Sequence, residues 1–340
     1  MKNLFDYATK ELSQDAFLRW LFENHNCKNE KVRQVCRKLF NKFTSDELDF
    51  SKIENLTTMA QWKYIDVSIW FTIDNKKYLI VIEDKTTSQE HKQLQNYNEQ
   101  IKKHNEWLID NDAENIIEKV YKVFYKTAEI WEEEKERIKD AQWLNILDIE
   151  EIHALFGNIP PTNSEVLDYY IEHIQKTYQT LFDYQSKPIY EWCKTYAVFT
   201  TYSKRLIEKY STEINEKSCR AEIYQGRYAQ TFLQKNLQNN ATVELGLIFR
   251  EWGCTAWIKV WDTDFGWKTL FSRKEELENL SFENTRLSWE NKKYKNRIRI
   301  IKKSFTENLT YEEFNDWIEN CIKDYLDLAK KIAIVPNLVQ

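Results

Sequence analysis

Apolar residues recur with helical spacing in two segments near the start of the chain. Within residues 13–25 the apolar stripe includes Phe17, with Ser13 as the expected N-cap and Asp15 as a favourable acid in the first turn. A second stripe with the same spacing lies within residues 29–43. The pattern predicts two amphipathic helices.

The hydrophobic pattern then changes from helical spacing to alternation. Residues 64–71 alternate and are rich in β-branched and aromatic types, whereas residues 78–82 form a nearly continuous apolar run. Between them Asp74 and Asn75 give a turn signal that lacks the usual glycine. An antiparallel hairpin is therefore expected over residues 63–85.

The rest of the chain mixes helical and strand patterns. In the first half a polar helix from Ser88 to about His104 is followed by strands at 120–125 and 144–147 and a helix at 149–156. The second half is expected to contain helices at 164–186 and 188–210, strands within 241–271, a basic strand at 292–303 and a helix at 310–331. This order predicts a mixed α/β domain, followed by an α+β domain.

Glycine and proline are scarce, which affects both domain organisation and function. The 340 residues include 5 Gly and 4 Pro, and none of these precedes Gly157. Glycine-rich phosphate-binding loops are thereby excluded from the first half. The glycine and prolines in residues 157–163 interrupt regular secondary structure. They mark the expected linker between a domain at 1–156 and a domain at 164–340.

Charge, cysteine usage and hydropathy narrow the class of protein further. The net charge of −5 gives no global nucleic-acid signature, although it leaves room for a local basic patch. The six cysteines are scattered without a C-x-x-C pair, which favours reduced thiols over disulfides or a zinc site. No apolar run reaches the ~20 residues of a membrane span. A cytoplasmic protein without membrane association is expected.

Acidic and basic side chains combine with the strand pattern at the hairpin. Asp66 lies in its first strand, and Glu83, Asp84 and Lys85 end its second. Alternation places Glu83 and Lys85 on one face and Asp84 on the other, and Asp66 can approach Glu83 across the hairpin. Two converging carboxylates repel unless a cation separates them, and Mg²⁺ is commonly held by one or two carboxylates.

This pattern resembles the PD-(D/E)xK nuclease superfamily over roughly residues 5–150, and in particular a bacterial subfamily of it. Ile65-Asp66 corresponds to the "PD" element with Ile in place of Pro, and Glu83-Asp84-Lys85 corresponds to "(D/E)xK". The resemblance implies a restriction-endonuclease-like core of a helix, a mixed β-sheet and a helix. It also implies a Mg²⁺- or Mn²⁺-dependent phosphodiesterase.

Two further elements extend the resemblance. Gln93 and Tyr97 match the Q-x-x-x-Y element of RecB-like members, where both side chains face the active site. Glu11 matches the first-helix acid that joins the metal site in many members. The implied site thus has Asp66, Glu83 and Glu11 as metal ligands. Its implied catalytic residues are Asp66, Glu83, Lys85, Gln93 and Tyr97.

Each of these residues also has a structural interpretation. Asp66 could be a polar residue at a strand edge, and Glu83 with Lys85 could be a surface ion pair of little energetic value. Gln93 and Tyr97 could be ordinary residues of a solvated helix, and Glu11 could interact with a helix dipole. An inactive nucleic-acid-binding or regulatory protein of the same fold is therefore the alternative function. A defence nuclease switched on by a signal is another.

A basic segment near the C-terminus is the second candidate functional feature. Residues 292–303 carry seven cations and no acid. As a strand, this segment would present a row of phosphate-contacting side chains, namely Lys293, Lys295, Arg297, Arg299 and Lys302. The alternative is a charged edge strand that prevents aggregation. The expected partner is nucleic acid, with DNA preferred over RNA, and the chain could also form a homodimer.

The tryptophans at 252, 257, 261 and 267 are expected in the core rather than at a base-stacking surface.

Overall fold

The structure is a computed structural model, and it forms two compact units, Met1–Thr180 and Leu181–Gln340. Each unit is described by itself. The residues that the structure describes are 3, 5, 11–88, 90, 93–111, 113–192, 197–215, 218–224, 228–237, 241–250, 253–262, 297–305 and 309–333.

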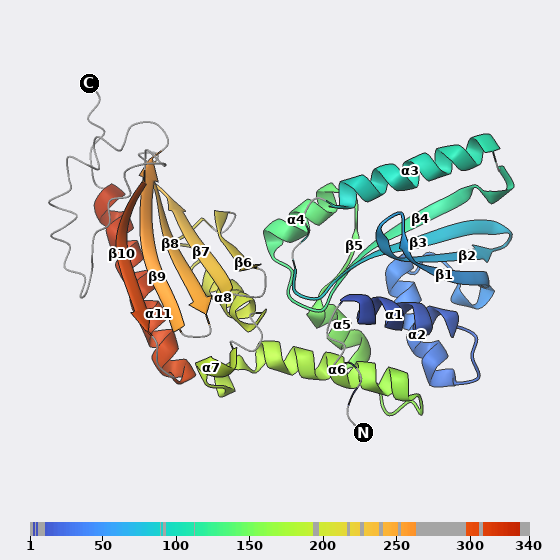
Figure 1. The fold of residues 1–340 in the computed structure, drawn as a ribbon, viewed down its shortest axis with the longest axis horizontal. Coiled ribbons are helices and arrows are strands. Elements are labelled where there is room, and N and C mark those ends of the chain that lie inside the picture. Colours follow the sequence, from blue (N-terminus) through green and yellow to red (C-terminus); the bar gives the residue numbers. More distant parts are fainter. Residues whose placement is uncertain are drawn as a thin grey trace. The chain divides into compact units, whose positions relative to one another are not determined.

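Within the described residues, the first unit is built on a mixed sheet with the strand order β1-β2-β3-β4-β5 (Figure 1). The strands are β1 Glu54–Trp62, β2 Ile65–Ile73, β3 Lys76–Lys85, β4 Ile117–Lys126 and β5 Asn145–Leu147. The pairs β1–β2 and β2–β3 are antiparallel, whereas β3–β4 and β4–β5 are parallel. The carboxyl ends of β3, β4 and β5 therefore meet at one edge of the sheet.

The hairpin expected over residues 63–85 is confirmed as β2 and β3. Ile73 pairs with Lys76, so Asp74 and Asn75 form the two-residue turn, with φ of 49° and 62°. These residue types tolerate a positive φ, which explains a tight turn without glycine. The sequence analysis did not identify β1, because this edge strand is mostly exposed and lacks apolar alternation.

Helices cover both faces of this sheet (Figure 1). Their bounds are α1 Glu11–Glu23, α2 Glu30–Thr44, α3 Gln93–Asn111, α4 Glu132–Asp140, α5 Ile149–Phe156 and α6 Glu165–Phe182, with 3-10 turns at Phe50–Lys52 and Ala113–Asn115. The ring of Phe40 on α2 lies 5.4 Å from that of Phe71 on one face. On the other face, Leu94 and Ile101 of α3 join Leu79 in a buried cluster. An α/β unit with helices on both faces is thus confirmed.

Two helix starts differ from the sequence-based expectation. α1 begins at Glu11, so Ser13 lies inside the helix and is not its N-cap. α3 begins at Gln93 instead of Ser88 and continues to Asn111, beyond His104. By contrast, α2 begins after Asn29, whose side chain accepts hydrogen bonds from the first helical N–H groups.

The helix α6 belongs to the first unit for most of its length. Tyr170 stacks on Phe17 of α1 at 3.5 Å between ring centroids, and its hydroxyl lies 2.9 Å from that of Tyr125 on β4. Asn3 also donates to the backbone of Tyr169. These contacts explain why the first unit extends to Thr180, beyond the linker expected at residues 157–163.

Within its described residues, the second unit contains an antiparallel sheet with the order β10-β9-β8-β7-β6. Its elements are a 3-10 turn at Tyr184–Ser186, α7 Ile189–Trp192, α8 Ala197–Lys209, β6 Arg220–Tyr224, β7 Tyr228–Asn236, β8 Ala241–Arg250, β9 Gly253–Asp262, β10 Arg297–Phe305 and α11 Tyr311–Ala333. Phe249 of β8 contacts both Phe199 of α8 and Phe314 of α11, so the two helices cover one face.

The aromatic content of the second unit contributes to its core where it is described. Trp257 is buried, as expected, and its ring lies across Gly246, where a Cβ atom would collide with it. Trp252 and Trp267 lie outside the described residues. Among the helices that are described, none is long and apolar enough to cross a membrane.

Candidate active site

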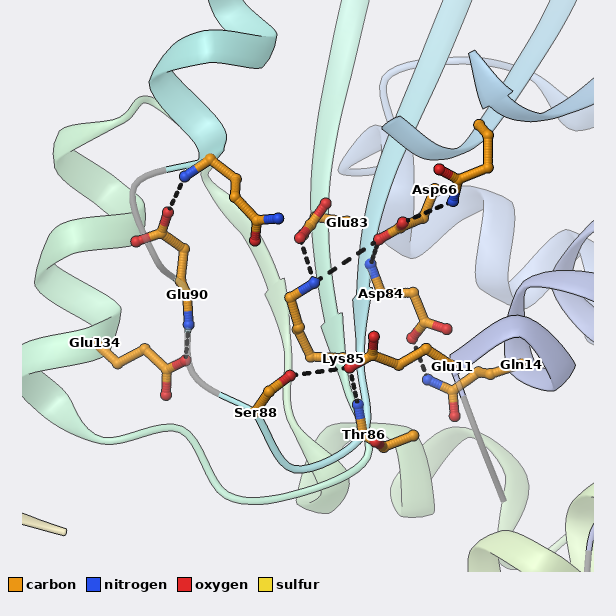
Figure 2. A network of polar contacts seen from close by, with 12 residues as sticks. Glu11, Gln14, Asp66, Glu83, Asp84, Lys85, Thr86, Ser88, Glu90 and Glu134 are labelled. Atoms are coloured by element: carbon orange, nitrogen blue, oxygen red, sulfur yellow. Dashed lines mark hydrogen bonds and ion pairs between the residues drawn. The ribbon is translucent and has the colours of Figure 1, made fainter. Parts of the chain in front are cut away.

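The candidate site forms where the β2–β3 hairpin ends. Val67 and Ile82 are the last paired residues of the hairpin, so Asp66 and Glu83 lie one position further, opposite each other. Asp66 is anchored because its Oδ2 accepts a hydrogen bond of 3.0 Å from the backbone N–H of Asp84. The hairpin register therefore brings the two acids together (Figure 2).

Lys85 lies between these two acids. Its Nζ is 2.5 Å from Glu83 Oε1 and 4.0 Å from Asp66 Oδ2, and the side chain is buried (Figure 2). Burial opposes its charge, but the carboxylates of Glu83 and Asp66 outweigh burial and raise the pKa of Lys85. The ammonium group thus occupies the region between the carboxylates that we expected a metal ion to fill.

Glu83 is a buried acid whose negative charge is opposed by its surroundings despite its ion pair with Lys85. Burial, followed by the nearby charge of Asp66, raises the pKa of Glu83 to about 8. Its Oε2 atom accepts no hydrogen bond of ordinary geometry. A buried carboxylate oxygen in this state is destabilising unless a proton or a cation neutralises it.

The donor set fits a hard divalent cation but not a larger metal cluster. Asp66 and Glu83 supply carboxylate oxygens at one point, and Mg²⁺ needs only one or two carboxylates, with water and phosphate oxygens completing its shell. No group of three or more His, Cys, Asp or Glu side chains in the described part of the chain is arranged to hold a metal. A His- or Cys-rich site is therefore not supported there.

Glu11 lies near this site and accepts hydrogen bonds from the loop after β3. Its Oε1 accepts hydrogen bonds from Ser88 Oγ at 2.9 Å and from the N–H of Thr86 at 3.4 Å (Figure 2). Its charge is also among those that raise the pKa of Lys85. Glu11 thus orders the chain around Lys85, but it does not form a three-acid metal group with Asp66 and Glu83.

The first turns of α3 carry the other two candidate residues. Tyr97 is buried, and after burial itself the charges of Glu83 and Asp66 are the largest causes that raise the pKa of its phenol. This electrostatic coupling places Tyr97 close to the two acids. Gln93 begins α3, and its backbone N–H donates to Glu90 Oε1 at 2.7 Å.

A buried polar cluster next to the site, formed by Gln14, Asp15 and Asp84, was not predicted from the sequence. Gln14 of α1 donates a hydrogen bond to Asp84 Oδ1 (Figure 2). The carboxyl groups of Asp15 and Asp84 also interact with each other. Burial raises the pKa of Asp15 to about 7, and the charge of Asp66 adds to the effect. Asp15 is thus a buried acid rather than an exposed first-turn residue. Its helical spacing from Leu18 and Phe22 is the sequence signal that agrees with this buried position.

Replacing Asp15 with asparagine is expected to flatten the pH dependence of folding. Because its pKa rises from 3.8 to about 7, the folded state keeps a proton that the unfolded state has lost. Stability therefore falls as pH increases through this window. Asp15→Asn should gain at least about 1.4 kcal/mol at about pH 8, the equivalent of one pKa unit, and little at about pH 4. Urea unfolding across this range measures the effect.

Asp110→Asn is the matched control for this prediction, since Asp110 is an exposed acid on α3. This variant should follow the pH dependence of the unmodified protein. A parallel pH profile for Asp15→Asn would contradict the prediction.

A second buried ion pair lies beside the site and was also missed. Lys126 is the register partner of Lys85 on β4, and its Nζ lies 2.8 Å from Glu134 Oε2. The second oxygen of Glu134 accepts a 3.0 Å hydrogen bond from the N–H of Glu90, whose carboxylate in turn accepts from Gln93 (Figure 2). This chain of contacts joins β4 to the start of α3. The sequence does contain a signal for this ion pair. Lys126, like Lys85, is a lysine that ends a buried strand.

The basic candidate residues belong to the second unit. Lys293 and Lys295 lie outside the described residues, whereas Arg297, Arg299 and Lys302 lie in β10. Arg297 pairs with Trp261 and Arg299 with Lys259, and the register shifts between Arg299 and Ile301. The pairing of β10 with β9 is therefore not continuous along the strand.

Known proteins provide no additional guide to this site. Comparison of the chain with protein-family models, curated proteins and solved structures finds no match in any of the three. A function for the chain must therefore come from the residues and contacts described above.

Proposed function

We propose that this chain is a metal-dependent nuclease that hydrolyses phosphodiester bonds. DNA is its expected substrate, and the cytoplasm is its expected location. The observation that carries the proposal is the convergence of Asp66, Glu83 and Lys85 at the end of one hairpin. The mixed sheet with helices on both faces is compatible with a restriction-endonuclease-like core. The resemblance to the PD-(D/E)xK superfamily supports the same assignment.

Asp66 and Glu83 would hold Mg²⁺ or Mn²⁺ in this proposal. When bound, the ion would polarise the phosphodiester and offset the negative charge that develops during hydrolysis. The ion would also offset the burial and the nearby charge of Asp66, the two largest causes that raise the pKa of Glu83.

Lys85 has the central role among the protein's own groups. Its ammonium carries three N–H donors and no acceptor, so it can orient an attacking water and stabilise negative charge on phosphate oxygens. The protein holds it ready through Glu83, and Glu11 orders the adjacent loop through Ser88 and Thr86. The buried Tyr97 of α3 interacts with Glu83 and Asp66, and Gln93 lies one helical turn before it, so the two residues would help to orient Lys85 or the strand being cut.

Metal-dependent cleavage is the direct test of the proposal. The full chain is incubated with Mg²⁺ or Mn²⁺ and with linear, nicked and single-stranded DNA and with RNA. We expect cleavage of at least one substrate, abolished by EDTA and by Asp66→Asn, because the asparagine keeps an acceptor for the Asp84 N–H but loses the charge. Asp110→Asn on exposed α3 should cleave normally. Absence of cleavage on every substrate would refute the proposal.

One observation favours the alternative of a non-catalytic nucleic-acid-binding or regulatory protein. The ion pair of 2.5 Å between Lys85 and Glu83 satisfies the charge that a metal would otherwise neutralise. Mn²⁺ titration calorimetry separates the two functions. A nuclease should bind Mn²⁺ in a manner that depends on Asp66, whereas a binding-only protein should show no such site.

A further inference from the structure

The turn between β1 and β2 combines an unusual backbone shape with unusual residues. Trp62 pairs with Ile65, so Lys63 and Tyr64 are the two turn residues. Both have positive φ, at 52° and 70°. Two-residue hairpin turns of this kind normally use Asn-Gly or Asp-Gly, because a positive φ is unfavourable for most side chains with a Cβ atom.

The next turn of the same sheet provides an internal comparison. Between β2 and β3 the positive-φ positions are occupied by Asp74 and Asn75, which tolerate this conformation. The chain thus builds one turn from tolerant residues and the other from a lysine and a tyrosine. Unfavourable backbone conformations are concentrated at functional sites, so these two side chains need an explanation beyond folding.

Lys63 lies at one end of a partly exposed group of aromatic rings, and the exposed Tyr64 follows it in the turn. Tyr64 is 79% exposed, and Lys63 Nζ lies 5.6 Å from the centroid of the Trp62 ring. Trp62 contacts Trp70 at 5.1 Å and His104 at 5.2 Å. We call the whole group the aromatic platform, and its members are Trp62, Tyr64, Trp70, His104 and Trp107.

The far end of the aromatic platform is also open to solvent. Trp107 is 55% exposed, and its ring is stacked on His104 with 6.3 Å between the centroids. Burial, followed by the charge of Lys63, lowers the pKa of His104, so its ring is neutral at physiological pH. The platform thus exposes uncharged ring faces beside one lysine cation.

The turn is physically tied to the candidate active site. Gln61, which also has a positive φ of 52°, donates a hydrogen bond of 3.1 Å from Nε2 to Asp66 Oδ1. Asp66 follows Tyr64 by two residues along β2. A chain segment bound at the turn therefore lies next to the group that we propose to take part in hydrolysis.

We propose that the turn and the aromatic platform bind an unpaired stretch of nucleic acid. Exposed bases would stack on Tyr64 and Trp107, and Lys63 would contact the phosphate backbone. In a duplex both faces of each base are already stacked, so only unpaired nucleotides can use such rings. This inference rests on the proposed function in naming single-stranded nucleic acid as the substrate class of the same site.

The chain allows a test in which binding and folding change in opposite directions. Lys63→Asn with Tyr64→Gly replaces the turn by Asn-Gly, the preferred sequence for its backbone, while removing the cation and the exposed ring. Asp74→Asn with Asn75→Gly makes the same turn sequence in the β2–β3 hairpin, away from the platform, and is the matched control.

Fluorescence anisotropy in EDTA measures binding of labelled oligo(dT) and oligo(U) of about 12 nucleotides, within the ~4–16 nucleotides that one single-strand-binding module covers. We expect the Lys63→Asn/Tyr64→Gly variant to bind roughly 5- to 150-fold more weakly, with an equal or higher melting temperature. The control variant should bind like the unmodified protein, and a duplex of the same length should bind more weakly than the single strand. The DNA and RNA arms identify which single strand is preferred.

Two results would overturn this inference. One is unchanged single-strand affinity in the Lys63→Asn/Tyr64→Gly variant, and the other is duplex binding as tight as single-strand binding. The binding experiment and the cleavage experiment can fail independently of each other. Turn-dependent binding without cleavage under any metal condition would retain the platform and reject the nuclease, whereas cleavage with turn-independent binding would do the reverse.

Discussion

Replacing Lys85 with alanine is expected to lower metal-dependent cleavage by roughly 100- to 1000-fold, the usual cost of removing one preorganised charge-stabilising group. The ammonium of Lys85 lies within 4.0 Å of both candidate metal ligands and is held in place by Glu83. No other described cation is paired with these two acids. Initial rates of cleavage at saturating Mg²⁺ or Mn²⁺ provide the measurement.

Lys76→Ala is a matched control on the same strand. Lys76 begins β3 and forms an exposed ion pair with Glu118, far from the end that carries Lys85. This variant should cleave at the unmodified rate. Cleavage by Lys85→Ala at an undiminished rate, in protein that melts normally, would remove Lys85 from the mechanism and the main support from the proposed function.

Glu134→Gln should give the largest loss of stability, about 3–5 kcal/mol. The side chains of Lys126 and Glu134 are only 3% and 1% exposed. Glutamine keeps an acceptor for the N–H of Glu90 but leaves the charge of Lys126 buried without its carboxylate partner. Urea unfolding of the full chain measures the effect. The quantity compared is the midpoint urea concentration of the transition in which the first unit unfolds.

Two further variants show whether the buried charge is the cause. Lys126→Met combined with Glu134→Leu should recover most of the stability, because an apolar pair of similar volume replaces a buried ion pair at little cost. Glu118→Gln breaks the exposed pair with Lys76 and should cost less than about 1 kcal/mol. A similar small loss for Glu134→Gln would show that the buried pair is not structurally important.

The hairpin and the position of its acidic side chains could be predicted because they depend on local patterns. Alternation over residues 64–71 and the apolar run at 78–82 defined the two strands. Their pairing then placed Asp66 opposite Glu83, since side chains alternate along a strand. Lys85 was identified because a lysine directly after a buried strand is unfavourable unless it is paired.

Other parts of the site depend on contacts between distant segments. Asp15 is suited both to the first turn of a helix and to a buried position, and only the start of α1 at Glu11 decides between them. The contact between Gln14 and Asp84 joins residues in separate elements, so no local period reveals it. The position of Lys85 between the acids was likewise not predicted, because it depends on the side-chain conformation of a long, flexible residue.

The division between the units shows the same limit. Glycine and proline in residues 157–163 mark a break in regular structure, and α5 does end before them. They do not show whether the next helix, α6, packs against the first unit or belongs to the second. Tyr170 decides this through its contacts with Phe17 and Tyr125, which are separated from it by most of the first unit's sequence.

The buried acids under and around the hairpin end have a consequence for protein engineering. Asp15 and Asp84 each have a pKa raised by burial, so neutral substitutes at these two positions should make the fold more stable at neutral pH, whereas Glu83 is paired with the buried ammonium of Lys85. A selection for heat resistance alone would therefore favour replacement of buried acids directly beside Asp66, Glu83 and Lys85. Libraries designed for a more stable protein can vary Asp15 and Asp84 but should hold the three proposed catalytic residues constant.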